Sequence, residues 1–232
     1  MSDTPSAPIS APRIASLRLR RGDRVKVELD DGRTLSVDVE VVFRAGLRKG
    51  DVVDEALEAQ LLESDLRSRA RAAAFSLLSA RARSRKELKD RLRRKDFPAG
   101  VVADCLDALE AAGWLDDAAF ARSMVRDRLR LRPRGPGRMT QELRAKGVSE
   151  EIARAAVAGV FDDEDVSVPD LALEVAQGWL RRQPAAAKDA LLSRDFSPER
   201  DKARRRFFAF LARRGFAGTV ARTALDRMRD DA

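Results

Sequence analysis

One pattern of six positions occurs three times along this chain, with the same spacing each time and no gap inside any copy. Each copy has two apolar residues four positions apart, then a lysine or arginine, then three further apolar or small residues. The three copies are Leu88, Leu92, Lys95, Phe97, Val101 and Cys105; Met139, Leu143, Lys146, Val148, Ile152 and Ala156; and Phe207, Leu211, Arg214, Phe216, Val220 and Ala224. Such self-similarity is typical of a repeated supersecondary unit. The chain is therefore predicted to carry three copies of one helical repeat.

Each copy is predicted to contain three helices. In the first copy we expect helices over 67–80 and 84–95, followed by a third that opens at Pro98. Ser84 and Glu87 fit the capping box that starts a helix, and proline is tolerated in a first turn because the N–H groups there lack partners. These signals place the helix boundaries of the first copy.

The second copy has its own start signals. Asp116 is a good N-cap for its first helix, and Ser149 is expected to cap the third. The second helix should follow the break at 133–137. Between the second and third helices lies Gly147, which suits the left-handed geometry that ends a helix. Gly215 has the same place in the third copy, whereas the first copy has Asp96 there.

The third copy is interrupted, and the N-terminal segment has a different pattern. The third copy's first helix is expected over 170–182, and the insertion after it is expected to be an extra short helix plus a loop. Near the N-terminus, apolar residues alternate over 24–29 and 34–41 around Asp30-Asp31-Gly32, which predicts a β-hairpin with a tight turn. A preceding strand over 14–19 and helical segments over 42–47 and 55–62 should support it, since a lone hairpin is marginally stable.

The predicted fold is mainly all-α: three tandem three-helix, helix-turn-helix-like repeats in an elongated array, with a small N-terminal β-hairpin subdomain. The expected parts are a disordered tail (1–12), a β-hairpin and helix subdomain (13–65), the first repeat (66–113), the second repeat (114–161), and the third repeat (162–232) with its insertion near 183–200.

Composition argues against several classes of enzyme. The chain has no histidine, which removes Ser-His and Cys-His nucleophiles and the usual zinc sites. It also lacks a G-x-x-x-x-G-K-[ST] phosphate loop. We predict no catalytic residue, no metal site and no cofactor. Cys105 is the single cysteine and is expected to be a buried small hydrophobe. Without an apolar membrane span or a signal-peptide pattern, the protein is predicted to be cytoplasmic and to have no membrane contact.

The charge is grouped in blocks that follow the repeat. The net charge is +8, from 46 Lys and Arg against 38 Asp and Glu. Twelve basic residues fall in 67–95, nine in 122–146 and seven in 199–214, while 103–119 and 149–174 are acidic. Charge runs on helices are usually solvated faces. Three blocks in register with a repeat would instead form a stripe for phosphate groups, with salt-dependent and sequence-tolerant binding.

Two further features limit the possible ligands. Phe75, Phe97 and Phe120 lie at core spacing, so base stacking is not predicted. Asp116 and Asp117 could form a metal-binding pair, although helix capping explains them better. The acidic stretches between the basic blocks favour a partner that is itself patterned, such as a nucleoprotein.

Several ordered segments resemble the RecX family of recombination regulators. SRKELKDRLRRKDF, followed by PAGVVADCLDALEAAGWLDDAAFA, is similar to the family's first repeat and linker, and GPGRMTQELRAKGVSEEIARAAV is similar to its second. The similarity covers residues 67–161 well and the third repeat more faintly. It implies a protein without catalytic residues that lodges in the groove of the RecA filament on single-stranded DNA. There it would block filament extension or promote disassembly, lowering ATP hydrolysis and strand exchange.

On this hypothesis the partners are the RecA filament and single-stranded DNA, with double-stranded DNA left open, and the protein is expected to be a monomer that acts in DNA repair. We assign the contacts to ten cations: Arg85, Lys86, Lys89, Arg93, Arg126, Arg130, Arg138, Arg144, Arg205 and Arg213. For each one the alternative is a solvated surface charge.

Two other function classes stay open. A helix-turn-helix-like DNA-binding module would prefer a duplex site and act independently of RecA. The sequence shows no clear recognition helix with Asn, Gln and Arg at base-reading positions, which weighs mildly against it. A nuclease would need a metal cluster of acids in a cleft, whereas the acids here look like caps and helix-face residues.

Overall fold

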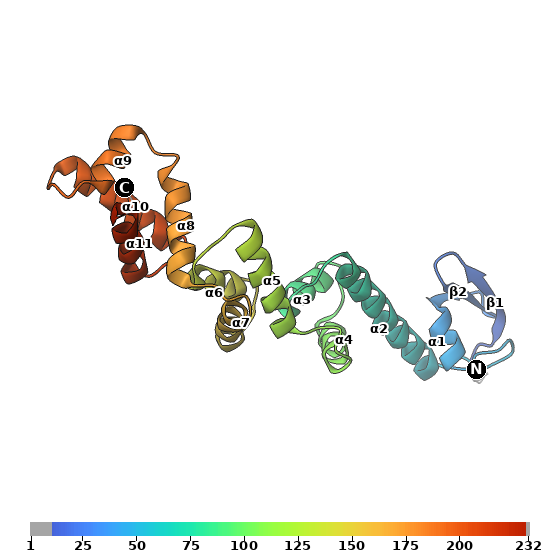
Figure 1. The fold of residues 1–232 in the computed structure, drawn as a ribbon. Helices are drawn as coiled ribbons and strands as arrows, with labels where there is room; N and C mark the ends of the chain where they lie inside the picture. The colour runs from blue at the N-terminus through green and yellow to red at the C-terminus, as the bar shows by residue number, and fades with distance from the viewer. Residues whose placement is uncertain (1–10, 231–232) are drawn as a thin grey trace, which may run out of the picture. The chain divides into compact units, whose positions relative to one another are not determined.

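The computed structural model describes residues 11–230, which form a three-stranded sheet followed by eleven helices (Figure 1). The strands are β1 (Ile14–Arg20), β2 (Arg24–Leu29) and β3 (Thr34–Asp38). The helices are α1 (Val39–Arg44), α2 (Glu55–Ala80), α3 (Arg85–Arg93), α4 (Ala99–Ala111), α5 (Asp117–Leu131), α6 (Pro136–Ala145), α7 (Glu150–Asp163), α8 (Val168–Leu180), α9 (Ala185–Leu192), α10 (Pro198–Arg213) and α11 (Gly218–Asp230). The prediction of a mainly helical chain with a small N-terminal β subdomain is confirmed.

The chain divides into two compact units. The first contains the residues up to Arg81 together with Leu88–Ala111, and the second contains Ala82–Glu87 together with the residues from Ala112 onward. Helix α3 therefore contributes its first residues to the second unit and the rest to the first. Most of the predicted tail, residues 1–10, lies outside the described residues.

The N-terminal sheet is an antiparallel meander in the order β1-β2-β3. Leu17 pairs with Val27, and Val27 pairs with Leu35. The turn after β2 holds three residues, because the N–H of Leu29 donates to the carbonyl of Arg33 (2.9 Å). Of these three residues only Gly32 has a positive φ, 85°, a combination typical of a type I turn followed by a left-handed residue. All three predicted strands are present.

The third strand is shorter than the predicted 34–41, and the first helix begins earlier than the predicted 42–47. The Asp38 carboxylate accepts the N–H of Glu40 (2.9 Å) and caps α1. Val39 and Val41 therefore lie in a helix, where Val41 is buried against the sheet and Val39 is exposed. The alternating apolar residues predicted that the strand would continue. The start of a helix can also carry apolar residues two positions apart, so the pattern fits both structures.

Helix α2 joins two segments that were expected to be separate helices, 55–62 and 67–80. It runs for 26 residues without a break. Asp65, in its middle, is only 4% exposed and accepts the backbone N–H of Asp38 (2.8 Å) while pairing with Arg24. The same helix thus contacts the sheet and also packs against α4.

The predicted caps of the helical copies are confirmed. The Ser84 hydroxyl accepts the N–H of Glu87 (3.1 Å), and Asp116 accepts the N–H groups of Ala118 and Ala119 (2.7 and 2.9 Å). Ser149 caps α7 through the N–H of Ile152 (3.2 Å). In the third copy the insertion forms α9, whose Leu191 is fully buried in the core. The expectation of an extra short helix is therefore confirmed as well.

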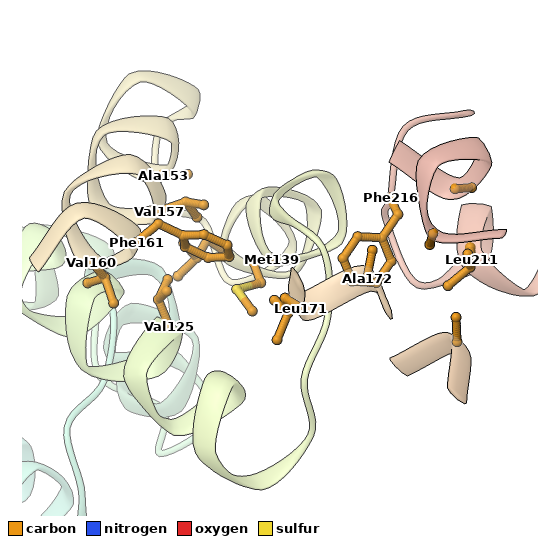
Figure 2. Close-up of a cluster of buried hydrophobic side chains, with 14 of the residues drawn as sticks. Val125, Met139, Ala153, Val157, Val160, Phe161, Leu171, Ala172, Leu211 and Phe216 are labelled. Atoms are coloured by element: carbon orange, nitrogen blue, oxygen red, sulfur yellow. The ribbon is translucent and has the colours of Figure 1, made fainter. Parts of the chain in front are cut away.

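The repeated positions also behave alike in three dimensions. The first, second and fourth positions of the pattern are buried in every copy: Leu88, Leu92 and Phe97; Met139, Leu143 and Val148; Phe207, Leu211 and Phe216. The second and third copies share one apolar core, in which Met139 lies beside Leu171 and Phe216 beside Ala172 (Figure 2). Cys105, expected to be buried, is half-buried, and burial raises the pKa of its thiol.

The turn between the second and third helices of each copy is left-handed. Asp96, Gly147 and Gly215 have φ values of 63°, 87° and 87°, as the sequence predicted. In the second and third copies, atoms of another copy lie very close to the turn glycine. A Cβ atom on Gly147 would come under 3.0 Å from the Lys86 side chain, and one on Gly215 would come that close to the backbone of Arg138.

These close approaches belong to one arrangement that occurs twice in the second compact unit. The Ser84 hydroxyl donates to the carbonyl of Lys146 (2.5 Å), and the N–H of Gly135 donates to the carbonyl of Arg214 (2.8 Å). In both places the residue before a copy's second helix contacts the cation that precedes the next copy's turn glycine. We call this contact the turn junction. The first copy has no copy before it, so its turn can carry Asp96, which is exposed.

Candidate nucleic-acid interface

The ten cations predicted to contact RecA or DNA lie on four helices: α3, α5, α6 and α10. Several of them form ion pairs within the second unit. Arg126 donates to Asp163 and Glu164 (both 3.1 Å), Arg144 lies 3.3 Å from Glu150, and Arg138 donates to Glu142 (3.2 Å). The pairs of Arg126 and Arg144 are exposed and contribute little to stability, so these two side chains can exchange partners at low energetic cost.

The other candidates divide into two groups. The guanidinium of Arg93 donates to the carbonyl of Phe97 (3.4 Å), the backbone N–H of Arg85 donates to Asp117 (2.7 Å), and Lys86 packs beside Gly147. Within residues 11–230, four further candidates are exposed and form no ion pair: Lys89, Arg130, Arg205 and Arg213. The binding role of all ten stays a prediction.

A hollow that the sequence did not reveal lies in the second unit, with a volume of about 460 Å³. It is lined by the end of α5 and the segment after it, by α8 and the two residues after it, and by the end of α10. Five arginines line it: Arg132, Arg134, Arg181, Arg182 and Arg214. Glu174 is the one carboxylate among its lining residues. We call this site the arginine hollow.

Arg134 and Arg214 are the half-buried members of the arginine hollow. Burial lowers the pKa of Arg214, and the positive charges of Arg134, Arg182 and Arg132 lower it further. The Arg214 guanidinium lies over the ring of Phe210, 5.3 Å from its centroid, and donates to the carbonyl of Pro133 (3.4 Å). The Nε of Arg134 is buried and has no hydrogen-bond partner among the described residues. These two side chains carry positive charge into the hollow.

Glu142 holds one side of this region together. Its carboxylate accepts from Arg128 (2.8 Å), from Arg138 (3.2 Å) and from Arg134, and its side chain is 14% exposed. Burial alone would raise the pKa of Glu142, but the hydrogen bond from Arg128 and the charges of Arg134 and Arg128 lower it overall. One carboxylate therefore orients three arginines of the second basic block.

An exposed aromatic ring was also not anticipated. Phe97 and Phe120 are buried, as their spacing predicted, but Phe196 in the segment after α9 is 92% exposed. The guanidinium of Arg200 lies 4.7 Å from its ring centroid. The sequence did not predict that this ring is exposed, because Phe196 lies in the insertion and outside the repeated pattern.

The acidic pair Asp116 and Asp117 is occupied in helix capping. Asp116 caps its own helix, and Asp117 accepts the N–H of Arg85 at the start of α3, so capping accounts for both carboxylates. Over residues 11–230, no group of three or more His, Cys, Asp or Glu is placed to hold a metal ion. Likewise, none of the described helices is both long and apolar enough to cross a membrane.

Comparison with known proteins identifies similar chains. Family models of the first and second three-helix domains of RecX match residues 70–109 and 116–157. The regulatory protein RecX of Levilactobacillus brevis is 32% identical over 182 residues, which are 76% of this chain and 68% of that protein. The regulatory protein RecX of Mycobacterium avium is 33% identical over 159 residues, 68% of this chain and 84% of that protein. A crystal structure of regulatory protein RecX superimposes with a TM-score of 0.71 at 24% identity, covering 95% of this chain and all of that one.

Proposed function

The chain belongs to the RecX family, and on that premise we propose that it regulates homologous recombination and DNA repair by binding the RecA filament on single-stranded DNA. In this role it inhibits filament extension, ATP hydrolysis and strand exchange, in the cytoplasm, as a monomer without catalytic activity of its own. The observation that carries the proposal is the match of two consecutive three-helix domains to models of the RecX family, whose members include relatives named regulatory protein RecX.

The physics of the surface supports this role. A regulator of a filament needs no chemistry, because a ligand that binds one state of a polymer more tightly shifts the equilibrium toward that state. Lys89, Arg130, Arg205 and Arg213 are exposed cations without ion pairs in the described part of the chain, and they are available to phosphate groups or to acidic protein surface. The acidic side chains that neighbour other cations, such as Asp163 beside Arg126, favour a partner with charges of both signs.

The first test measures DNA-stimulated ATP hydrolysis by the cognate RecA with this protein present far below the RecA concentration. We expect a several-fold drop, because one bound regulator at a growing filament end affects many RecA protomers. The control is an equal concentration of a DNA-binding protein of similar net charge, which should have little effect. Unchanged hydrolysis, even at equimolar protein, would refute the proposed function.

A second prediction concerns the four unpaired cations. Changing Lys89, Arg130, Arg205 and Arg213 together to glutamine should raise the concentration needed for half-inhibition of RecA by about tenfold or more, at roughly half a kcal/mol for each lost contact. The matched control changes Arg20, Arg21, Arg48 and Lys49, which are also exposed, to glutamine with the same loss of charge. Equal effects of both variants would show that net charge alone matters and would reject the assignment.

The alternative function is a DNA-binding module that acts independently of RecA. The arginine hollow favours some DNA contact, since it gathers five guanidinium groups on one concave surface. Tight, salt-sensitive DNA binding without any effect on RecA would support this alternative over the filament regulator.

A further inference from the structure

The arginine hollow is built by three segments that are distant in sequence. The segment after α5 contributes Arg132 and Arg134, the residues directly after α8 contribute Arg181 and Arg182, and the residue after α10 contributes Arg214. Gly135, beside Arg134, donates to the carbonyl of Arg214, so the turn junction itself holds two of the three segments together. The gathering of the arginines thus depends on the packing of the second and third copies.

The charges in the hollow are poorly neutralised. Five arginines face one lining carboxylate, Glu174, which forms no ion pair among the described residues. Arg134 does pair with Glu142, but that carboxylate already serves Arg128 and Arg138. Like charges held close together repel, and they repel more strongly where they are half-buried; the charges of Arg134, Arg182 and Arg132 lower the pKa of Arg214 for this reason. Five arginines against one lining carboxylate leave an excess of positive charge in the hollow, which favours the binding of an anion from outside.

The chemistry of the lining selects the kind of anion. A guanidinium donates two parallel hydrogen bonds, which fit the oxygens of a phosphate group. The two rings beside the hollow are used internally: Phe210 stacks on Trp179 (centroids 5.7 Å apart) and lies under Arg214. The hollow therefore offers donors for phosphate groups and no free ring on which a base could stack. Its volume is within the range of ligand sites, roughly 300–1,000 Å³.

We propose that the arginine hollow is a phosphate-binding site that takes the phosphodiester backbone of single-stranded DNA. Arg134 and Arg214 lie at its half-buried floor, while Arg132, Arg181 and Arg182 are exposed at its rim. Recognition through the backbone alone makes binding sequence-tolerant and salt-dependent. The choice of DNA as the source of the phosphate rests on the proposed function, but the site itself needs no RecA.

The test uses the full-length protein and a labelled oligothymidylate in fluorescence anisotropy titrations over a series of NaCl concentrations. The variant changes Arg132 and Arg182 to glutamine, since both are exposed rim residues whose side chains have no hydrogen bond or ion pair among the described residues. We expect the affinity to fall about tenfold or more and the slope of log K against log salt to shrink by about 1.4, as two lost phosphate contacts on a single strand predict.

The matched control changes Arg122 and Arg222 to glutamine, which removes the same charge from exposed positions of the same unit that form no ion pair among the described residues. This control should keep a slope close to that of the wild type. Circular dichroism and thermal unfolding check that both variants fold.

Three outcomes would overturn the proposal. Equal losses in both variants would mean that only net charge matters. Unchanged DNA binding by both variants would mean that the hollow does not bind single-stranded DNA. The third outcome is that the variant of Arg132 and Arg182 binds oligothymidylate normally but no longer inhibits RecA. The hollow would then bind an acidic protein surface and not DNA. Failure of the proposed function is separate, because it would appear as no inhibition of RecA by the wild-type protein.

Discussion

Changing Gly215 to alanine is expected to destabilise the second compact unit by about 3 kcal/mol or more. Two effects add. Gly215 has a φ of 87°, which strains any residue with a Cβ, and the new Cβ would come under 3.0 Å from the backbone N and Cα of Arg138. Backbone atoms cannot turn away as a flexible side chain can. The midpoint of thermal unfolding should fall by about 6–12 °C for a chain of this size.

Two further glycine variants separate these effects. Gly135 has an ordinary φ of −71°, but a Cβ there would come under 3.0 Å from the carbonyl of Gly215, so Gly135→Ala tests the contact without the backbone strain. Gly159 lies in α7 with nothing within 4 Å of an added Cβ, so Gly159→Ala should be neutral or stabilising by up to about 1 kcal/mol. If Gly215→Ala and Gly159→Ala unfold at the same temperature, the turn junction is not a close contact in solution.

Changing Glu142 to glutamine is expected to destabilise the protein by about 2 kcal/mol, less than the 3–5 kcal/mol typical of a fully buried pair, because its arginine partners are partly exposed. The loss arises because Arg128, Arg134 and Arg138 would share a neutral group in place of a carboxylate. Urea unfolding at neutral pH measures it. Glu150→Gln removes an exposed carboxylate that pairs with Arg144 and Arg154, and it should change stability by no more than about 0.5 kcal/mol.

The Glu142 carboxylate also predicts that the stability of the protein depends on pH. The pKa of Glu142 is lower in the folded protein than its ordinary value of 4.5, so the folded state favours the charged form. Its stabilising contribution is complete above about pH 4.5 and is lost as the pH falls through the lower folded pKa. The difference in free energy of unfolding between wild type and Glu142→Gln should therefore shrink in acid. A difference that stayed constant down to pH 3 would contradict this assignment.

Features set by neighbouring residues were predictable from the sequence. The left-handed turns at Asp96, Gly147 and Gly215 follow from the repeat and from the short-range geometry of a helix end. The caps at Ser84, Asp116 and Ser149 depend on residues two or three positions away. Local patterns are less decisive where two structures fit them equally, as at Asp38, where an alternating run ends in a helix because one carboxylate caps it.

Features formed by segments that are distant in sequence could not be predicted from the sequence. Arg132 and Arg134 belong to a basic block that the sequence showed plainly, but Arg181 and Arg182 lie outside every block, and only the packing of α8 brings them to the same hollow. Phe196 was unplaced for a related reason, since nothing in the insertion tells which side chain faces solvent. The ten predicted contact residues came from charge density alone, which does not distinguish Lys89 from Arg126, whose charge is matched by Asp163 and Glu164.

The turn junction is directional, because one copy contributes the start of a helix and the next contributes a turn. Contacts of this head-to-tail kind do not close on themselves, and in principle they can add members without limit and produce fibres. In the first copy the equivalent turn carries Asp96. A Cβ at Gly147 or Gly215 would come under 3.0 Å from the docked helix start, so we expect the Cβ that Asp96 already has to obstruct the same contact. Asp96 is therefore expected to stop the head-to-tail series of turn junctions at the first copy. An Asp96→Gly change would remove this side chain from a turn that is already exposed, and the turn could then accept a helix start from another molecule of the same chain.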